Sequence, residues 1–559
     1  MTVLDHVFAR LVELGVDHIF GVPGDFSLAI MDRLESTSTV DWVGTSGELG
    51  AAYAADGYAR NRGYGALLTA FGVGELSAAT GVAGATAEDV AVLHIVVGPA
   101  TRAVNARSPL HHTFHDGDFD RFRRAAANLT ETNFSVGLDA PTATIDRAFV
   151  ALRSTKRPVY LLLPQDVAEI AAATPAPLSL PRVAPTAIKN ASDLLSRFFT
   201  EVPDAVAVLG HLIWRRECGD VGTALARRGA RIAELPNALG SAPRSEPTYV
   251  GVYNGKLSSP PVRDEVEGSH GRVLIGCVLS DTTTGGLSHR FEEESTLAVG
   301  RDAIVWRDQR VDLPFESACR LLLEYWPPRN ERFESAAPGP SRRAPVEGDE
   351  SVISLRAVWA ALLPRLSPGT RLFVDTGSSF YGLLDSRIPE GIRVESATLW
   401  AAIGWSLPAG IGSAIAARSE HVVVVIGDGA FQQVASELAL VCTMGLTPVI
   451  VIIDNGGYTV ERAIRGEHAR YNDVPAWDYV AFSRALGLGN SVASLAHVTT
   501  PEDLERAVRT LSDDTRAHVV VVQTHPLDVS GTLAQMSTVL RAKAGLASLS
   551  DTLVSTTNA

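Results

Sequence analysis

Cysteine is scarce in this chain of 559 residues. Its four cysteines, Cys218, Cys277, Cys319 and Cys442, lie far apart, and no two of them form a Cys-x-x-Cys motif. This spacing gives no sign of a disulfide framework or of a dithiol pair. It favours buried free thiols in a reducing compartment, and we therefore expect a cytoplasmic protein.

Long apolar runs are missing as well. No stretch approaches the roughly 18 apolar residues of a membrane-spanning helix, so we expect no membrane partner. Residues 2–16 place apolar side chains at positions 3, 7, 11 and 14, and polar or charged side chains at positions 5, 6, 10 and 13 interrupt them. This pattern predicts an amphipathic helix and argues against a signal peptide.

Basic residues are fewer than acidic residues. The chain has 49 Lys and Arg against 63 Asp and Glu, a formal net charge of −14. This balance argues against nucleic acid or an anionic membrane surface as a partner. An anionic substrate would therefore have to be attracted by local dipoles or local cations, because the overall field repels it.

The chain contains no repeat of 20 to 50 residues, but two segments read as linkers. Residues 171–186 are rich in Pro and Ala, and residues 334–351 are rich in Pro, Gly and charged side chains. They predict three domains, at residues 1–178, 187–334 and 350–559. In each domain short apolar runs alternate with helical stretches, which predicts an α/β fold with parallel sheets. The expected strands are residues 66–70, 90–98, 159–163, 205–210, 273–279, 421–426 and 448–453, and the expected helices are residues 49–61, 220–228, 431–444 and 530–544.

The third domain contains the most informative motif. A Gly-Asp-Gly sequence at 427–429 follows one predicted strand, and Asp454 and Asn455 follow the next. Both sites therefore lie at the carboxyl ends of strands, where open α/β sheets bind ligands. A carboxylate and an amide oxygen suit a hard cation such as Mg²⁺, which would in turn hold a diphosphate. The Gly-Asp-Gly sequence alone and the Asp454-Asn455 pair alone are each also typical of an ordinary turn.

The first domain offers four further candidates, Asp25, Glu48, His111 and His112. Asp25 lies in a Gly/Pro turn, where a carboxylate is common without any function. Glu48 opens a predicted helix, where the helix dipole alone would favour it. The adjacent histidines occur in a polar segment, and both a proton-transfer role and a plain loop are open for them.

Eight segments in sequence order resemble the thiamine diphosphate-dependent 2-keto acid decarboxylases. The amino-acid sequences of these segments are most similar to those of the indolepyruvate, phenylpyruvate and branched-chain enzymes, and less similar to those of the pyruvate decarboxylases. The segments are residues 21–26, 46–60, 69–78, 110–119, 249–255, 404–410, 427–432 and 457–466. The resemblance implies three doubly wound parallel-sheet domains: pyrimidine-binding, central and diphosphate-binding. It also implies a homodimer at minimum and favours a homotetramer, because the family binds its cofactor between subunits.

The resemblance assigns the metal and catalytic residues. The family's Mg²⁺ ligands match Asp428, Asn455 and the carbonyl of Gly457. The first Asn of the family's Asn pair is Asp454 here, at a position that does not bind the metal. Glu48 matches the carboxyl group that activates the cofactor, and the family's acid–base set matches Asp25, His111, His112 and Glu461. Glu461 also fits an exposed helix carboxylate paired with Arg465.

The resemblance also assigns the residues that surround the cofactor and the substrate. Ile403 matches the apolar wedge that bends the cofactor, and the carbonyl of Ala401 would orient its aminopyrimidine. The expected cofactor-binding residues are Thr376, Ser378, Ala401, Ile403, Gly427, Gly429, Ala430, Gly456 and Tyr458. The expected substrate-pocket residues are Phe380, Val460, Met536 and Leu540.

The implied reaction is the non-oxidative decarboxylation of a 2-keto acid to an aldehyde and CO₂, through a thiamine diphosphate ylid and an enamine. Thr376 and Leu540 stand where relatives often carry the larger Gln and Phe, which favours a bulky aromatic, branched or long-chain substrate. A carboligase on the same fold and an inactive regulatory homologue are the alternatives.

Overall fold

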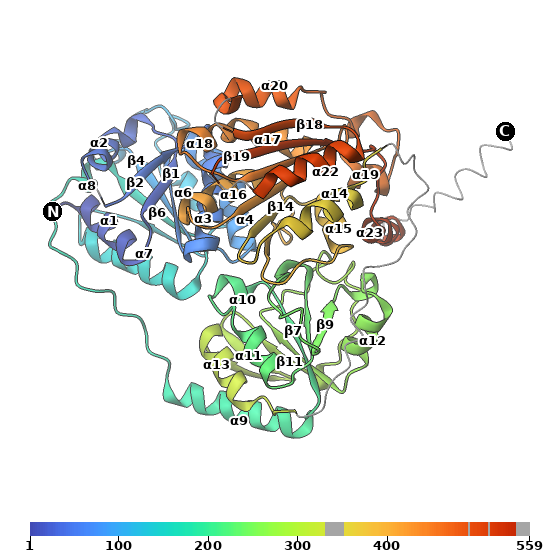
Figure 1. Ribbon diagram of the computed structural model, residues 1–559. Helices are drawn as coiled ribbons and strands as arrows, with labels where there is room; N and C mark the ends of the chain where they lie inside the picture. The colour runs from blue at the N-terminus through green and yellow to red at the C-terminus, as the bar shows by residue number, and fades with distance from the viewer. Residues whose placement is uncertain (38, 330–351, 490–491, 513–514, 544–559) are drawn as a thin grey trace, which may run out of the picture. The chain divides into compact units, whose positions relative to one another are not determined.

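The computed structural model describes the whole chain except residues 38, 330–351, 490–491, 513–514 and 544–559 (Figure 1). The chain forms two compact units. The first contains Met1–Arg182, Leu407–Ser419 and Val434–Leu446, and the second contains Val183–Ser406, Glu420–Gln433 and Thr447–Ala559. The predicted linker at 334–351 lies outside the described residues, and the three domain boundaries stay predictions. No helix among the described residues has the length and apolar character needed to cross a membrane.

The first unit is built on a six-stranded parallel sheet with the order β2-β1-β3-β4-β6-β5. Right-handed crossovers in an order that reverses direction place helices on both faces of such a sheet. The strands are β1 (His18–Gly21), β2 (Asp41–Gly44), β3 (Gly65–Ala70), β4 (Val92–Gly98), β5 (Thr132–Ser135) and β6 (Val159–Pro164). The helices are α1 (Val3–Glu13), α2 (Leu28–Ser36), α3 (Glu48–Arg62), α4 (Val73–Ala87), α5 (Thr101–Asn105), α6 (Arg121–Ala126), α7 (Pro141–Thr155) and α8 (Gln165–Ala168). The predicted amphipathic helix is α1, whose apolar stripe is buried.

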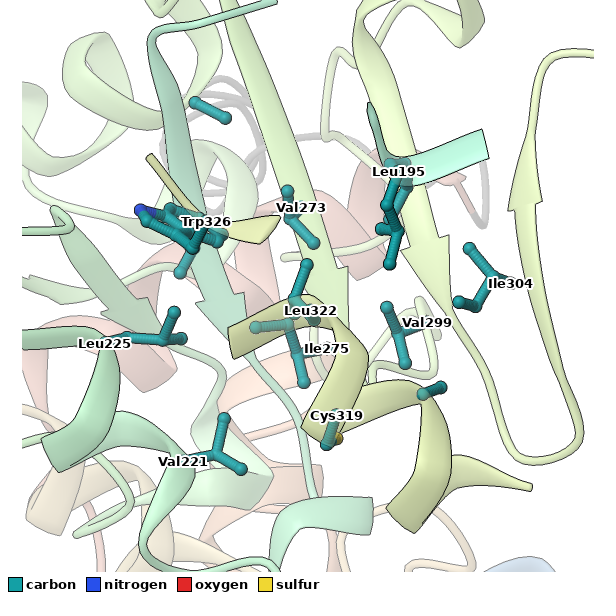
Figure 2. Packing of buried hydrophobic residues seen from close by; sticks show 14 of the residues in the cluster. Leu195, Val221, Leu225, Val273, Ile275, Val299, Ile304, Cys319, Leu322 and Trp326 are labelled. Carbon is teal, nitrogen blue, oxygen red and sulfur yellow. The ribbon is translucent and has the colours of Figure 1, made fainter. Parts of the chain in front are cut away.

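The second unit contains a seven-stranded central sheet with the order β13-β12-β11-β10-β7-β8-β9. Five strands are parallel, and β12 and β13 add an antiparallel edge. The strands are β7 (Ala205–Leu209), β8 (Ile232–Glu234), β9 (Tyr249–Val252), β10 (Gly271–Ile275), β11 (Thr296–Val299), β12 (Ala303–Trp306) and β13 (Gln309–Asp312). The helices are α9 (Pro185–Glu201), α10 (Leu212–Arg215), α11 (Val221–Arg227), α12 (Pro260–Gly268) and α13 (Phe315–Tyr325). Figure 2 shows the apolar cluster under this sheet, where Val273 and Ile275 pack with Leu322.

The second unit also contains a six-stranded parallel sheet with the order β15-β14-β16-β17-β19-β18. Its strands are β14 (Arg371–Val374), β15 (Arg393–Glu395), β16 (Val422–Gly427), β17 (Val449–Asp454), β18 (Val492–Val498) and β19 (Ala517–Gln523). The helices between residues 355 and 543 are α14 (Leu355–Leu362), α15 (Ser378–Leu384), α16 (Ser406–Ala416), α17 (Asp428–Val434), α18 (Ala439–Thr443), α19 (Thr459–Ile464), α20 (Tyr479–Ser483), α22 (Pro501–Arg509) and α23 (Gly531–Lys543). Of these, α16 from Leu407 onward and α18 belong to the first unit. The three parallel-dominated sheets confirm the predicted fold class.

Two predicted elements were wrong in extent. The strand expected at 273–279 ends at Ile275, because Gly276 has a φ of 66° and leaves the extended region. The helix expected at 431–444 is broken into α17, a 3₁₀ turn at Ala435–Leu438 and α18. Val434, at φ −135° and ψ 16°, leaves the helical region and makes the break. The helix expected at 530–544 is α23, and Ala544 lies outside the described residues.

Within the first unit, α3 and α16 cross at a pair of glycines. A β-carbon added at Gly57 would lie 1.9 Å from the carbonyl oxygen of Ala409, and one added at Gly412 would lie 1.9 Å from that of Ala54. Both obstacles are backbone atoms, so a side chain at either position would force the two helices apart.

We predict that Gly57→Ala lowers the melting temperature of the protein. Alanine in a helix interior is normally more favourable than glycine by about 1 kcal/mol. Overpacking against fixed backbone costs roughly 1–3 kcal/mol or more and should outweigh that gain. Calorimetry measures the melting temperature. Gly137→Ala is the control, because nothing lies within 4 Å of a β-carbon there. A Gly57→Ala protein as stable as the wild type would contradict this account of the crossing.

Candidate active site

The Gly-Asp-Gly motif and Asn455 come together at the carboxyl edge of the third sheet. The strands β16 and β17 are neighbours in the sheet, with Gly427 opposite Ile453, so the residues that follow them lie side by side. Asp428 is buried and accepts hydrogen bonds from the backbone N–H of Gly429 at 2.6 Å, Asn455 at 3.1 Å and Gly457 at 3.0 Å.

The chemistry of this set fits a magnesium ion. Burial raises the pKa of Asp428 to about 6, the nearby Asp454 adds to the rise, and the N–H groups oppose it. A divalent cation would relieve the cost of burying the charged carboxylate. The amide oxygen of Asn455 is also buried and accepts from Gly457 N–H at 3.3 Å, so two hard oxygen donors meet there.

The surrounding backbone is open where a phosphate would have to approach. Apart from the adjoining residues of the chain, nothing lies within 4 Å of a β-carbon added at Gly427 or at Gly456. Gly429 is different, because its missing side chain makes room for the ring of Tyr458, 2.6 Å from the added β-carbon. Ala430 is buried in α17. The sequence-predicted cofactor residues around this motif therefore lie together.

Arg462, which the sequence interpretation missed, fixes the loop that contains Asn455. It is a buried residue of α19 and donates to the carbonyl oxygens of Asn455 at 3.1 Å and Gly456 at 2.7 Å. It also donates to Pro526 O and pairs with Asp473 at 2.9 Å. One guanidinium thus connects the proposed metal-binding loop to two other segments of the second unit.

We predict that Arg462→Met weakens Mg²⁺ binding about tenfold or more. Hydrogen bonds from a charged donor contribute roughly 1.5–3 kcal/mol each, and tenfold corresponds to about 1.4 kcal/mol. Isothermal titration with Mg²⁺ in the presence of thiamine diphosphate gives the affinity. Arg465→Met, an exposed position one turn away, is the control and should bind as the wild type does. Equal affinity in both variants would remove Arg462 from the support of the site.

The switch point of the third sheet lies between β14 and β16, where the strand order reverses direction. Thr376 and Ser378 follow β14, with Ser378 opening α15 after Gly377. Asp375, also missed from the sequence, is buried there and accepts from the N–H of Gly404 and Ser406 at 3.0 Å. Burial raises its pKa to about 6.

Asp375 holds the segment that contains Ala401 and Ile403 next to the end of β14. Ala401 has a φ of 58°, an unusual conformation for a residue with a side chain. Thr376 Oγ1 donates to the carbonyl of Ala397 at 3.3 Å in the same region. The structure therefore places Thr376 and Ser378, and the segment that contains Ala401 and Ile403, near the end of β14.

The four predicted substrate-pocket residues lie on three helices. Phe380 is on α15, Val460 on α19, and Met536 and Leu540 are on α23. The helix α23 packs against both of the others, and Arg541 Nη1 donates to the carbonyl of Ile464 at 2.9 Å. Glu461 is exposed on α19, and no ion pair joins it to Arg465 within the described chain.

In the first unit, Asp25, His111 and His112 converge although Asp25 is far away in the sequence. His111 Nε2 lies 2.8 Å from Asp25 Oδ2, and the ring centroids of the two histidines are 4.5 Å apart. The ligand atoms of all three residues lie within 4.8 Å of one another, close enough to hold a metal ion as well. Phe26 stacks on the His111 ring, with centroids 4.9 Å apart. The polar segment is therefore an ordered cluster.

His112 is held in an unusual conformation, with a φ of 60° and a buried Nδ1 that has no hydrogen-bond partner. Its carbonyl lies 2.3 Å from a β-carbon added at Gly72, so only glycine fits there. The N–H of Gly72 donates to Glu75 at 2.8 Å, and the hydroxyl of Tyr160 donates to the same carboxyl at 2.9 Å. Glu75, not predicted from the sequence, thus fixes the start of α4 against His112.

Glu48 lies in the first turn of α3, with its Oε1 3.2 Å from a β-carbon added at Gly74. The turn before it is anchored by Glu437, a buried carboxyl that accepts from the N–H of Ser46 at 3.2 Å and of Gly47. A side chain at Gly50 would displace Glu437, because an added β-carbon would lie 2.1 Å from Glu437 Oε1. Glu437 was also missed from the sequence.

Burial raises the pKa of Glu437 to about 7, although the two N–H groups lower it. A carboxyl with a raised pKa stabilises the fold fully below its ordinary value of 4.5, and this contribution is lost as the pH rises through 7. The shift corresponds to roughly 3 kcal/mol.

We therefore predict that the melting temperature of Glu437→Gln, measured relative to that of the wild type, is higher at pH 8 than at pH 5. The amide has no charge to desolvate at the higher pH. Scanning calorimetry at both values measures the difference. Glu35→Gln, an exposed position of the same unit, should show the same difference from the wild type at both pH values. A pH-independent difference for Glu437→Gln would contradict the raised pKa.

Two family models match the chain. Residues 1–122 match "Thiamine pyrophosphate enzyme, N-terminal TPP binding domain", and residues 383–522 match "Thiamine pyrophosphate enzyme, C-terminal TPP binding domain". Thiamine pyrophosphate and thiamine diphosphate are the same compound.

Curated relatives cover nearly the whole chain. An alpha-keto-acid decarboxylase of Mycolicibacterium paratuberculosis is 37% identical over 500 residues, 88% of each chain. One of Mycobacterium ulcerans is 36% identical over 547 residues, 96% of this chain and 95% of that one.

Two solved structures share the fold. The Rhodococcus jostii RHA1 thiamine diphosphate-dependent 4-hydroxybenzoylformate decarboxylase has a TM-score of 0.74 and 17% identity. Benzoylformate decarboxylase from Polynucleobacter necessarius has a TM-score of 0.75 and 19% identity. Each comparison covers 94% of this chain and 99% of the other.

Proposed function

Since the chain belongs to the thiamine diphosphate-dependent alpha-keto-acid decarboxylases, we propose that its substrate is a bulky aromatic, branched or long-chain 2-keto acid. The observation that carries the proposal is the packing of α15, α19 and α23, which contain the predicted pocket residues. Thr376 and Leu540 are smaller than the Gln and Phe that many relatives carry there, which leaves room for a larger side chain.

The proposed cofactor site is the carboxyl edge of the third sheet. Asp428, Asn455 and the carbonyl of Gly457 would hold Mg²⁺, and the open backbone at Gly427 and Gly456 would face the diphosphate. Bound thiamine diphosphate supplies an electron sink for the electron pair that remains when CO₂ leaves a 2-keto acid.

Glu48 is proposed to hydrogen-bond the pyrimidine ring nitrogen of the cofactor and so to favour the imino form of that ring. Its place in the first turn of α3 gives it an ordered backbone, and Glu437 keeps the preceding turn rigid through Ser46 and Gly47. Fixing one carboxyl group in this way contributes to catalysis by orientation, because the carboxyl does not have to be ordered during the reaction.

Asp25, His111 and His112 are proposed to deliver the proton that releases the aldehyde. The short contact between Asp25 Oδ2 and His111 Nε2 lets the carboxylate orient the ring and stabilise its protonated form. His112 adds a second ring 4.5 Å away, with a buried Nδ1 that has no hydrogen-bond partner. Glu461 on α19 is the fourth proposed member of this acid–base set.

The proposal extends to a cytoplasmic homotetramer, with a homodimer as the smallest active form, by resemblance to the family. The second candidate reaction is carboligation. Free aldehyde is the product expected here, because a cluster of proton donors favours protonation over attack on a second aldehyde. A 2-hydroxy ketone as the main product would identify the carboligase.

The test is a panel of 2-keto acids supplied with Mg²⁺ and thiamine diphosphate, read by aldehyde formation. We expect phenylpyruvate, indolepyruvate or a branched-chain 2-keto acid to exceed pyruvate by at least tenfold in kcat/KM, since one methylene in an apolar pocket contributes about 10-fold or more. Thr376→Gln together with Leu540→Phe should reduce this preference. Pyruvate as the best substrate would refute the proposed substrate class.

Glu48→Gln tests the proposed role of Glu48 with the same panel of 2-keto acids. It should bind thiamine diphosphate, as measured by the quenching of intrinsic fluorescence, and form aldehyde at least 100-fold more slowly. Full activity in this variant would remove Glu48 from the mechanism.

A further inference from the structure

The helix α23 contains two of the four proposed substrate-pocket residues, Met536 and Leu540, and packs against α15 and α19, which contain the other two (Figure 1). Apolar packing alone fixes this helix weakly. Of its buried side chains, Leu533 and Met536 are apolar, whereas Thr532 and Ser537 are polar. A helix of 13 residues is marginal without tertiary support, so its position depends on specific contacts.

One such contact joins the start of α23 to the end of α15. Asp385 directly follows α15, and its two carboxylate oxygens share the N–H of Thr532, at 3.2 and 3.1 Å. The same carboxylate accepts the hydroxyl of Thr532. The first turn of α23 contains no acidic residue of its own. Asp385 therefore supplies the acceptor and the negative charge that the first turn of a helix needs.

A second contact joins the other end of α23 to the end of α19. Arg541 Nη1 donates to the carbonyl oxygen of Ile464, the last residue of α19, at 2.9 Å. The last carbonyl groups of a helix have no partner within that helix and favour a cation. In both contacts, a charged side chain thus meets the end of a helix whose dipole has the opposite sign.

The two contacts enclose the pocket residues of α23. Thr532, Met536 and Leu540 follow one another at intervals of four residues, which places them along one face of the helix. Arg541 is the residue after Leu540. Asp385 and Arg541 therefore hold the two ends of the face that would contact the side chain of the substrate.

The segment that leads to α23 is fixed by other contacts. The N–H of Thr524 donates to the carbonyl of Asp454 at 2.9 Å, and the hydroxyl of Thr459 donates to the carbonyl of Pro526 at 2.9 Å. Loss of the Asp385 contact should therefore loosen α23 without releasing the loop proposed to bind the metal.

We propose that Asp385 is a positioning residue that sets substrate specificity through α23. By fixing the first turn of this helix to the end of α15, its carboxylate keeps Met536 and Leu540 in place, so that the wall of the pocket discriminates between substrate side chains. Arg541 supports the same wall from its other end. This inference rests on the proposed substrate pocket and adds the group that fixes its wall.

The test compares kcat and KM for phenylpyruvate and pyruvate in the enzyme loaded with Mg²⁺ and thiamine diphosphate. In Asp385→Ala, we expect the ratio of kcat/KM between the two substrates to move toward unity by about threefold or more, since one methylene in an apolar pocket contributes about tenfold. The change should lie mainly in the KM of phenylpyruvate, because contacts that bind ground state and transition state equally affect KM and not kcat. Arg541→Met should move the ratio in the same direction.

Hydrogen–deuterium exchange of residues 531–543 gives a second measurement that needs no substrate. Exchange at the start of α23 should be about threefold faster or more in Asp385→Ala, because the helix opens more easily. Asp385→Asn keeps an oxygen acceptor and should lie closer to the wild type in both measurements. Thr538→Ala is the matched control and should stay within about twofold of the wild type, because this exposed hydroxyl donates to Ala534 O in its own helix.

Unchanged exchange in Asp385→Ala would overturn the proposed anchoring of α23. Faster exchange with a substrate ratio within twofold of the wild type, or with an equal loss for both substrates, would overturn the role in specificity. Neither result bears on the proposed substrate class, which fails only if the wild type itself prefers pyruvate. In that case the ratio in Asp385→Ala should still move toward unity.

Discussion

The buried carboxylate of Asp428 is the constraint on which the loops of the proposed cofactor site depend. It receives three backbone N–H groups, one from its own turn and two from the loop after the neighbouring strand. These bonds fix the ends of β16 and β17 in one position. They do not remove the free-energy cost of burying the charged carboxylate, because the pKa of this carboxyl is still raised by burial. A bound divalent cation would remove that cost, so the geometry that orders the loop also prepares it for the metal.

Buried carboxyl groups accept backbone N–H groups in the same way at three other turns. Asp375 receives the N–H groups of Gly404 and Ser406, Glu437 receives those of Ser46 and Gly47, and Glu75 receives that of Gly72. Each is a buried acid that holds a glycine-containing turn next to a predicted catalytic or cofactor residue. Irregular backbone cannot satisfy its own N–H groups as a helix does, so the chain uses side-chain carboxyls for this purpose.

The predictable part of the fold was the part with a local signal. Apolar runs located the strands β16 and β17, and their ends located Asp428 and Asn455, because ligands gather at the carboxyl edge of parallel sheets. The helix broken at Val434 was not predictable, since the residues around it have ordinary helix propensity.

The buried acids had weaker signals. Asp375 directly follows an apolar run, as Asp428 does, and that pattern could have identified it. Glu437 and Arg462 bind backbone atoms of distant segments, and a backbone partner leaves no trace in the sequence. The convergence of Asp25 with the two histidines was likewise invisible, because each lies in a separate turn.

The path of the chain has a consequence for how this protein can be divided. Residues 407–419 and 434–446 belong to the first compact unit, although they lie between segments of the second. The glycine crossing of α3 with α16 and the anchoring of the Glu48 turn by Glu437 both depend on these returning segments. An N-terminal fragment cut at the end of the first continuous stretch would lack both. Modular exchange between relatives must therefore transfer the two short segments as well, and a recombination point drawn only between sequential blocks would separate contacts that fold together.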